Sequence, residues 1–140
     1  MKSFKVLTVP ALCTIPSLAL ATTVAYNPAF DDAAGSLDSV ACSDGPNGLT
    51  TRGYSTFGSL PKFPHISGAA AVAGWNSPNC GTCWELTYTN ASINVIAIDR
   101  AGEGFNIALG ALNELTGGQG MDLGRVDVAA RQVTSSVCGL

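Results

Sequence analysis

Two cysteines, Cys80 and Cys83, lie three positions apart in the stretch NCGTCWELTY, residues 79–88. Such a pair can be a redox dithiol, half of a metal site or part of two structural disulfides. A redox pair needs a helix N-terminus to lower a thiol pKa, but the residues after Cys83 predict a strand. A structural zinc site needs four cysteine or histidine ligands at matched spacings, and the chain has a single histidine, His65. Structural disulfides are therefore the favoured interpretation, and we expect no metal site.

The carboxylates of the regular segments are the candidates for glycoside hydrolysis. That reaction needs two carboxyl groups flanking the scissile bond, one as general acid and one as base or nucleophile. Asp99 is the best placed, because it ends an apolar strand before the glycine-rich turn AGEG. An aspartate in this position is also common as a turn or capping residue. The other carboxylates are Glu114 in the predicted helix and the outward-alternating Glu85 and Asp127.

Carbohydrate binding needs less than hydrolysis: aromatic faces, side-chain amides and carboxylates along an open groove. The chain offers several aromatic and amide candidates, namely Tyr26, Tyr54, Trp75, Asn76, Trp84, Phe105 and Asn106. Each of the aromatic residues alone is more often part of a core, so only a cluster would indicate a site.

The first 21 residues have the plan of a secretory signal peptide, with Lys2 and Lys5, an apolar run and a small-x-small site at Ala19-Leu20-Ala21. We expect cleavage after Ala21, which leaves residues 22–140 as one domain. No apolar segment is long enough to span a membrane. The mature chain keeps five basic residues against ten acidic ones, a net charge of −5. Because the basic residues are scattered singly, nucleic acid and anionic lipid are excluded as partners, and a neutral, hydroxyl-rich ligand is favoured.

Removal of the signal peptide also removes Cys13, so the mature chain holds four cysteines, Cys42, Cys80, Cys83 and Cys138. An even number in a small secreted domain predicts two disulfides. The residues alone leave three pairings open.

The elements that must position these residues are mostly short strands separated by turn signals. In chain order we expect a strand at 22–27, a turn-rich loop at 30–49 with one helical turn near 37–40, a loop with strand pieces at 51–68, a short helix within 67–75, a hairpin of 82–89 and 92–99, a helix within 105–118 and a strand at 124–133. This pattern favours a small β-barrel or an α+β domain. Asn90-Ala91-Ser92 in the predicted hairpin turn is a glycosylation sequon, although a tight turn would prevent its use.

The segments CSDG, AGWNSPNCGTCW and GFN, with a cysteine close to the C-terminus, are jointly specific. Together with VAYN, SINVIAID, GALNELTGGQ and GRVDV they make the chain from Val24 to Leu140 resemble the cerato-platanin family of secreted fungal proteins. The resemblance implies a mainly β fold, a six-stranded double-ψ β-barrel with one or two short helices, related to expansins, barwin-like proteins and one family of endoglucanases. It also implies the disulfides Cys42–Cys80 and Cys83–Cys138.

The function that the resemblance implies is non-catalytic binding of chitin or N-acetylglucosamine oligomers, without a cofactor. It further implies an elicitor of plant defence that meets a plant surface receptor, and a location in the fungal cell wall. Two alternatives are expansin-like, non-hydrolytic loosening of cellulose, and a monomer that self-assembles at interfaces as a surface-active wall protein.

The family's shallow sugar groove includes a strand-end aspartate, which Asp99 matches. The other motif positions near that groove are Tyr26, Ser43, Asp44, Gly45 and Asn76. In the related endoglucanases and expansins the second acid lies in a motif resembling HFD, and the matching stretch here is GFN. Its Asn106 is an amide and cannot serve as general acid, which favours binding over hydrolysis. Glu103 is the nearest substitute acid in the sequence.

Overall fold

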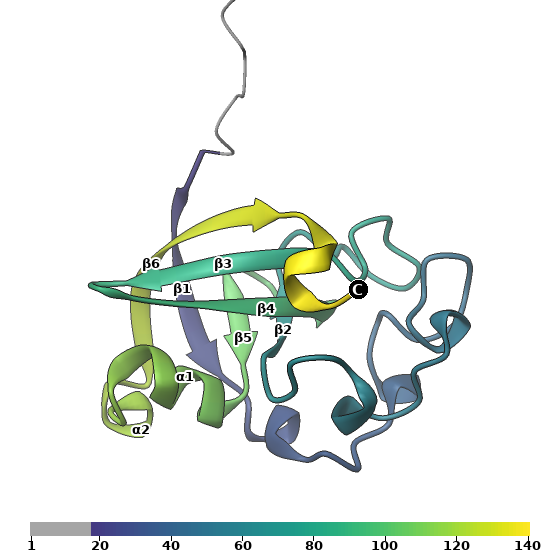
Figure 1. The fold of residues 1–140 in the computed structure, drawn as a ribbon, viewed down its shortest axis with the longest axis horizontal. Coiled ribbons are helices and arrows are strands. Elements are labelled where there is room, and N and C mark those ends of the chain that lie inside the picture. Colours follow the sequence, from purple (N-terminus) through teal and green to yellow (C-terminus); the bar gives the residue numbers. More distant parts are fainter. Residues whose placement is uncertain (1–17) are drawn as a thin grey trace, which may run out of the picture.

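Six strands close into a barrel in the order β1-β5-β2-β4-β3-β6 (Figure 1). The structure is a computed structural model, and it describes residues 18–140. The strands are β1 (Leu20–Tyr26), β2 (Ile66–Ala69), β3 (Cys83–Tyr88), β4 (Ala91–Arg100), β5 (Phe105–Ile107) and β6 (Arg125–Val133). Two pairings, β1 with β5 and β2 with β4, are parallel, and the other four are antiparallel. The predicted six-stranded double-ψ barrel is confirmed.

Two helices, α1 (Leu109–Thr116) and α2 (Gly120–Leu123), lie together at one end of the barrel (Figure 1). The N–H groups of Leu109 and Gly110 donate to the two carboxylate oxygens of Asp31, both at 2.8 Å, so a residue 78 positions earlier caps α1. The helix ends at Gly117, whose φ of 67° glycine adopts without strain. The predicted helix within 105–118 and its glycine stop are thus confirmed from Leu109 onward.

A long loop between β1 and β2 lies along one side of the barrel (Figure 1). It contains four short 3-10 helices, Pro28–Asp31, Leu37–Ser39, Thr50–Arg52 and Phe57–Ser59, and a fifth at Ser135–Cys138 follows β6. Leu37, Leu49 and Phe57 anchor this loop, because their side chains are buried in the same core as the barrel interior. Burial of such side chains explains why a segment rich in turns is ordered.

The disulfides Cys42–Cys80 and Cys83–Cys138 tie the long loop and the C-terminal segment to the region where β3 begins. The first bond joins the long loop to the segment before β3. The second joins the first residue of β3 to the C-terminal 3-10 helix. Both pairings that the family resemblance implied are confirmed.

Two local predictions were wrong. The segment within 67–75 is not helical: Ile66–Ala69 forms β2, and turns follow it. Three of the four residues of β2 are small, and all four are buried between β4 and β5. Pairing with both strands therefore outweighs the helical preference of the alanines in this segment. Phe105–Ile107 is strand β5 rather than the beginning of the helix, because it pairs with β1 and β2. No local pattern identified the short helix α2, but it agrees with the one or two short helices that the family resemblance implied.

The first described strand begins before the predicted cleavage point. Leu20 and Ala21 pair with Ala130 and Ala129, whereas the expected strand began at Thr22. Most of the predicted signal peptide, residues 1–17, lies outside the described residues, and cleavage after Ala21 stays a prediction. Within residues 18–140, no helix has both the length and the apolar character needed to cross a membrane.

Candidate functional site

Asp99 and Asn106 lie on either side of one glycine. Gly68 of β2 pairs with Asp99 of β4 on one side and with Asn106 of β5 on the other. Directly paired residues point to the same face of a sheet, and neighbouring strands are about 4.8 Å apart, so the two Cα atoms are separated by about 10 Å. Gly68 has no side chain to fill the space between them. An added Cβ there would lie 3.0 Å from the carbonyl oxygen of Arg100.

The same row of paired residues continues across the next two strands. Asn106 pairs with Ala25 of β1, and Ala25 pairs with Arg125 of β6. A hollow of about 360 Å³ lies at this end of the row, lined by Thr23, Ala25, Gly102, Glu103, Phe105, Asn106 and Arg125. The small residues Gly68 and Ala25 therefore separate three polar side chains. We call this row, Asp99–Gly68–Asn106–Ala25–Arg125, the polar groove.

The sequence interpretation missed Arg125, which belongs to the polar groove, and Thr23, which lines the hollow at its end. The Arg125 guanidinium donates to the Thr23 hydroxyl at 3.0 Å and contacts the carboxylate of Glu103. Arg125 opens the strand that was predicted at 124–133, so its type and position were visible. Its place in the groove could not be predicted from the sequence, because only barrel closure brings β6 beside β1.

Asp99 also has a structural role. Its Oδ1 accepts hydrogen bonds from the backbone N–H of Ala41 at 3.0 Å and of Arg100 at 2.8 Å. The neighbouring Cys42 N–H donates to the Ile98 carbonyl at 3.0 Å, so two contacts hold the long loop against β4. Among the described residues, the other carboxylate oxygen of Asp99 has no hydrogen-bond partner. That oxygen is the one available to a ligand.

The predicted residues Ser43, Asp44, Gly45 and Asn76 come together in a second cluster. The first three lie on the loop that Asp99 holds, and Asn76 lies in the segment between β2 and β3. Asp44 Oδ1 accepts from the indole N–H of Trp75 at 2.7 Å and from the Ser43 hydroxyl at 3.3 Å. The hydrogen bond from Trp75 is the largest cause that lowers the pKa of Asp44 below its ordinary value. Asn76 Oδ1 accepts from the backbone N–H of Asn47 at 2.9 Å. We call Ser43, Asp44, Gly45, Trp75 and Asn76 the Trp75 cluster.

Tyr26 does not join either group. It pairs with Ile107, on the opposite face of β1 from Ala25, and its ring packs against the core. Tyr54 and Trp84 also pack against the core, and the Trp84 ring meets Phe105 edge-on at a centroid distance of 5.5 Å. Trp75 is the exception among the aromatic candidates, because 62% of it is exposed.

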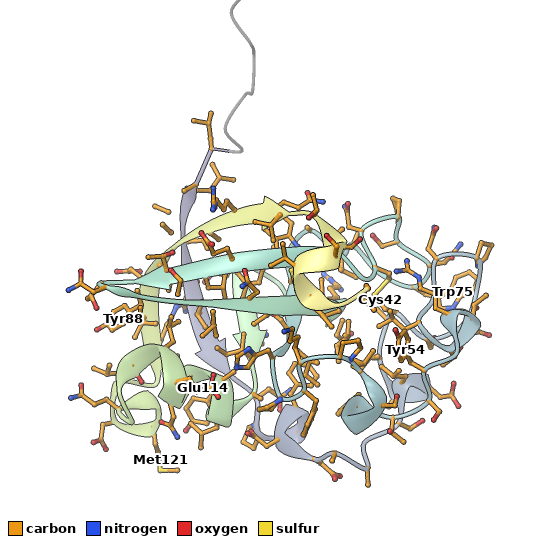
Figure 2. All side chains as sticks on the ribbon, in the orientation of Figure 1. Cys42, Tyr54, Trp75, Tyr88, Glu114 and Met121 are labelled. Atoms are coloured by element: carbon orange, nitrogen blue, oxygen red, sulfur yellow. A yellow bond between two sulfur atoms is a disulfide. The ribbon has the colours of Figure 1, made fainter. Side chains whose placement is uncertain are left out.

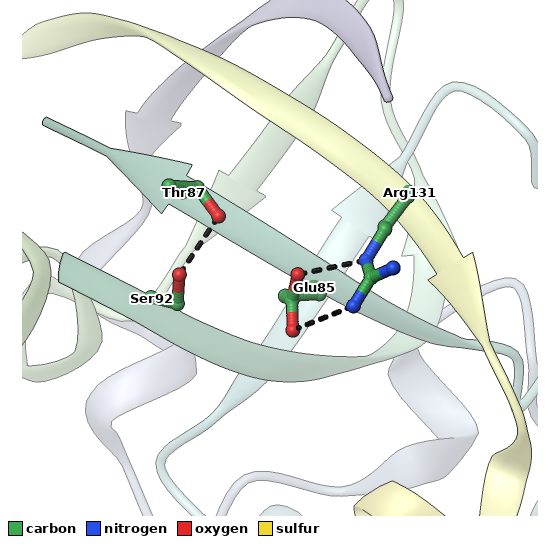
Figure 3. Close-up of polar contacts among 4 residues, drawn as sticks. All are labelled: Glu85, Thr87, Ser92 and Arg131. Atoms are coloured by element: carbon green, nitrogen blue, oxygen red, sulfur yellow. Dashed lines mark hydrogen bonds and ion pairs between the residues drawn. The ribbon is translucent and has the colours of Figure 1, made fainter. Parts of the chain in front are cut away.

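Three of the carboxylates considered for catalysis contact a basic side chain. Glu85 binds the guanidinium of Arg131 at 2.8 and 3.4 Å on the outer face of β3 and β6, next to a Thr87–Ser92 hydroxyl pair (Figure 3). Glu85 raises the pKa of Arg131 above its ordinary value. Glu114 of α1 contacts His65. Glu103, the substitute acid, is an exposed side chain in contact with Arg125.

The sequon residue Asn90 is exposed in a two-residue turn, because Tyr88 of β3 pairs directly with Ala91 of β4. The hydroxyl of Ser92, the third sequon residue, shares a 2.8 Å hydrogen bond with Thr87 (Figure 3). Glycosylation of Asn90 stays a prediction.

Comparison with known proteins extends over the whole predicted domain. The family model described as Cerato-platanin matches residues 22–140. A heat-stable 19 kDa antigen of Coccidioides immitis (strain RS) is 46% identical over 123 residues, covering 88% of this chain and 84% of the relative. The crystal structure of cerato-platanin 2 from M. perniciosa has a TM-score of 0.83 and 46% identity, covering 86% of this chain and all of that one. The solution structure of the fungal elicitor cerato-platanin has a TM-score of 0.74 and 41% identity, covering 83% of this chain and 95% of that one.

These relatives share both the sequence and the barrel. The match begins at Thr22, where the predicted mature chain begins, and runs to the last residue. The resemblance carried by the CSDG, AGWNSPNCGTCW and GFN segments is confirmed. The chain belongs to the cerato-platanin family.

Proposed function

We propose that this protein is a secreted, non-catalytic binder of chitin and N-acetylglucosamine oligomers, and that the polar groove is its binding site. The observation that carries the proposal is the row in which Asp99, Asn106 and Arg125 alternate with Gly68 and Ala25. Polar side chains separated by residues without bulk leave room for sugar rings and place hydrogen-bonding groups beside them.

The chemistry of the three polar groups suits an acetylated amino sugar. The free oxygen of Asp99 accepts a hydrogen bond from a hydroxyl or an acetamido N–H. The Asn106 amide both donates and accepts, so it can bind an acetamido carbonyl and a hydroxyl together. The Arg125 guanidinium donates only. A neutral glycan also agrees with the net charge of −5 that we expect for the mature chain.

The absence of catalysis is proposed from the second-acid position. Hydrolysis needs a proton donor opposite the base, and the side chain across Gly68 from Asp99 is the amide of Asn106. Glu103, the nearby carboxylate, lies at the far end of the groove in contact with Arg125. The arrangement supports binding of a glycan chain without cleavage.

The biological setting that we propose is outside the fungal cell and in its wall. Two disulfides in a domain of this size are typical of oxidising extracellular compartments. A solved relative is described as a fungal elicitor. We propose that this chain likewise elicits plant defence, through a receptor at the plant surface.

A second candidate function is expansin-like loosening of cellulose. The observation that favours it is the open form of the groove, which crosses the outer face of five strands and so admits a polymer as well as an oligomer. Filter paper that fragments without release of reducing sugar would support this function. Release of reducing ends would instead show hydrolysis.

The test of the first function is an NMR titration of the 15N-labelled mature protein with N-acetylglucosamine oligomers. We expect the amide signals of Gly68, Asn106 and Arg125 to shift together and to saturate. A reducing-sugar assay on insoluble chitin and cellulose run in parallel should stay at background. If saturating oligomer leaves the groove signals in place, the groove is not the binding site.

A further inference from the structure

Among residues 18–140, Trp75 is the large aromatic side chain that is exposed to water. It is 62% exposed, whereas Trp84 is partly buried against the core. Figure 2 shows Trp75 on the loop side of the molecule, at the opposite end from Tyr88 in the β3–β4 hairpin. A single exposed apolar residue is ordinary on a protein surface. The way in which this one is held is what distinguishes it.

The indole is fixed on its polar edge. Its N–H donates to Asp44 Oδ1 at 2.7 Å, and the Ser43 hydroxyl donates to the same oxygen at 3.3 Å. The ring also lies against Gly45: a Cβ added there would be 3.0 Å from Trp75 Cζ2 and 2.8 Å from Asn76 Oδ1. Gly45 has φ of 83°, which side chains rarely adopt, so two constraints favour glycine under the ring.

The backbone that follows Trp75 is constrained as well. Asn76 has φ of 58°, in the left-handed region that is sparsely populated by residues other than glycine. Two hydrogen bonds join Asn76 to Asn47: Asn47 N–H to Asn76 Oδ1 at 2.9 Å and Asn47 Nδ2 to the Asn76 carbonyl at 3.0 Å. The Arg52 guanidinium donates to the carbonyls of Asn47 and Cys80, and the Cys42–Cys80 disulfide closes the unit. A solvated surface tryptophan requires none of these contacts.

A rigid, exposed indole beside hydrogen-bond acceptors matches the chemistry of a pyranose ring. The apolar C–H face of the sugar covers the aromatic face, while its hydroxyls reach neighbouring polar groups such as the Asp44 carboxylate. Because Asp44 already holds the ring in place, binding loses little further side-chain freedom. An anionic membrane surface fits less well, since the nearest charged group is a carboxylate and the mature chain is acidic.

The Trp75 cluster is connected to the polar groove. Asp99 Oδ1 accepts from the backbone N–H of Ala41, and Asp44 follows three residues later. Three residues span at most about 10 Å, so the indole partner Asp44 cannot lie far from the end of the groove. We propose that Trp75 is a stacking platform for a pyranose ring of the glycan chain that occupies the polar groove, so that the site extends past Asp99 onto the loop. This inference rests on the proposed function of the groove.

The test uses the indole N–H signals of the mature protein in a titration with N-acetylglucosamine oligomers of increasing length, and with cello-oligosaccharides in a second series. Trp84 is the internal reference, because its N–H is bound to Thr82 Oγ1 at 2.8 Å in the partly buried region. We expect the Trp75 signal to shift with the longer oligomers, at the same saturation as the Asn106 amide. The series that shifts it identifies the sugar as chitin-like or cellulose-like.

Variants make the result quantitative. We expect Trp75→Ala to weaken binding of the longest oligomer about tenfold and to leave binding of the disaccharide unchanged, since the disaccharide occupies the groove alone. Trp75→Phe should retain part of the affinity for the longest oligomer, because phenylalanine keeps an aromatic face although it lacks the indole N–H. Should Trp75→Ala fail to fold, Trp75→Phe and the wild-type titration still decide the outcome.

Three results would overturn the inference, and they are distinguishable. If groove amides shift while the Trp75 indole does not respond at any oligomer length, the platform is wrong and the groove remains. If neither responds, the proposed function and the platform fail together. A third arm with anionic phospholipid vesicles completes the test: a Trp75 response to vesicles and none to glycans would replace the sugar with a membrane surface.

Discussion

Asp99 accepts a hydrogen bond from the backbone N–H of Ala41, so the carboxylate in the polar groove also fastens the long loop to the barrel. In the proposed binding site, one residue would therefore serve stability and binding through different oxygens. Asp99→Asn keeps an oxygen that can accept from Ala41, whereas Asp99→Ala removes it.

The two variants should separate the roles of Asp99. We expect Asp99→Ala to lower the free energy of unfolding by about 2 kcal/mol, the usual cost of two lost hydrogen bonds, and to weaken glycan binding. Asp99→Asn should keep most of the stability and still weaken binding. Urea denaturation and an oligomer titration measure the two effects. Unchanged binding in Asp99→Asn would show that Asp99 is purely structural.

Asn106→Asp tests the need for an amide in the groove with almost no change in shape. We expect binding of N-acetylglucosamine oligomers to weaken about tenfold, which corresponds to about 1.4 kcal/mol, because a carboxylate cannot donate to a carbonyl or a hydroxyl. Asn90→Asp is the matched control, since it makes the same charge change in the exposed hairpin turn. Calorimetric titration of both variants provides the comparison, and equal affinities would remove Asn106 from the site.

The hydrogen bond between Trp75 and Asp44 predicts a pH dependence. Because the folded-state pKa of Asp44 is lowered, the contribution of its charged form to stability is present above the ordinary pKa of 3.8 and is lost as the pH falls through the folded-state value. Trp75→Phe removes the hydrogen bond that is the largest cause of the lowered pKa, so the pKa of Asp44 should rise toward its ordinary value. The 13C signal of the Asp44 carboxyl, followed against pH, reports it directly. Ser43→Ala should raise it less, since the Ser43 hydrogen bond is the smallest of the causes.

The two disulfides should differ in function although they are similar in strength. Their loops span 38 and 55 positions, and chain entropy assigns each a stabilisation of about 4 kcal/mol. Double replacement by alanine of Cys42 and Cys80 should also weaken binding of long oligomers, because that bond braces the Trp75 cluster. The same replacement of Cys83 and Cys138 should cost stability alone. Denaturation measures the stability of both double variants, and an oligomer titration measures their affinity under conditions in which both are folded. An equal loss of affinity in the two variants would contradict this distinction.

The cap of α1 by Asp31 is a separate prediction about stability. Asp31→Ala leaves the N–H groups of Leu109 and Gly110 without their acceptors and should cost about 1 kcal/mol. Asp38→Ala is the control, because Asp38 is an exposed aspartate whose carboxylate makes no hydrogen bond among the described residues. Thermal unfolding followed by circular dichroism measures both variants. A similar midpoint for the two would mean that water replaces the cap without loss.

The family resemblance predicted the six-stranded barrel and the disulfide pairing, both of which the residues alone left open, and local signals predicted the helix C-terminus. The alternation in Arg125–Val133 and the glycines after Thr116 describe their own elements without tertiary information. The β2 segment was not predictable in this way. Ile66–Ala69 has the composition of a loop or a helix, and only its two neighbouring strands make it a strand.

The candidate site shows the same division. Asp99 and Asn106 were identified from their motifs, but their common neighbour Gly68 depends on the sheet order β4-β2-β5. Arg125 lies in the groove only because barrel closure places β6 beside β1. Tyr26 lies outside the groove, because strand alternation turns its ring toward the core. The sequence identifies each candidate residue by its type and motif, but only the folded structure shows which residues are neighbours on adjacent strands.

The strand order also governs when this protein can fold. Both partners of β1, the strands β5 and β6, come from the last third of the chain, and β6 lies between β1 and β3. A chain that emerges N-terminus first therefore cannot complete its barrel until the final strand has arrived. Long-range pairings of this kind slow folding and leave strand edges exposed in the meantime. A chain truncated before Arg125 should lack a closed barrel altogether, even though it keeps five of the six strands, including β4 and β5 on either side of Gly68.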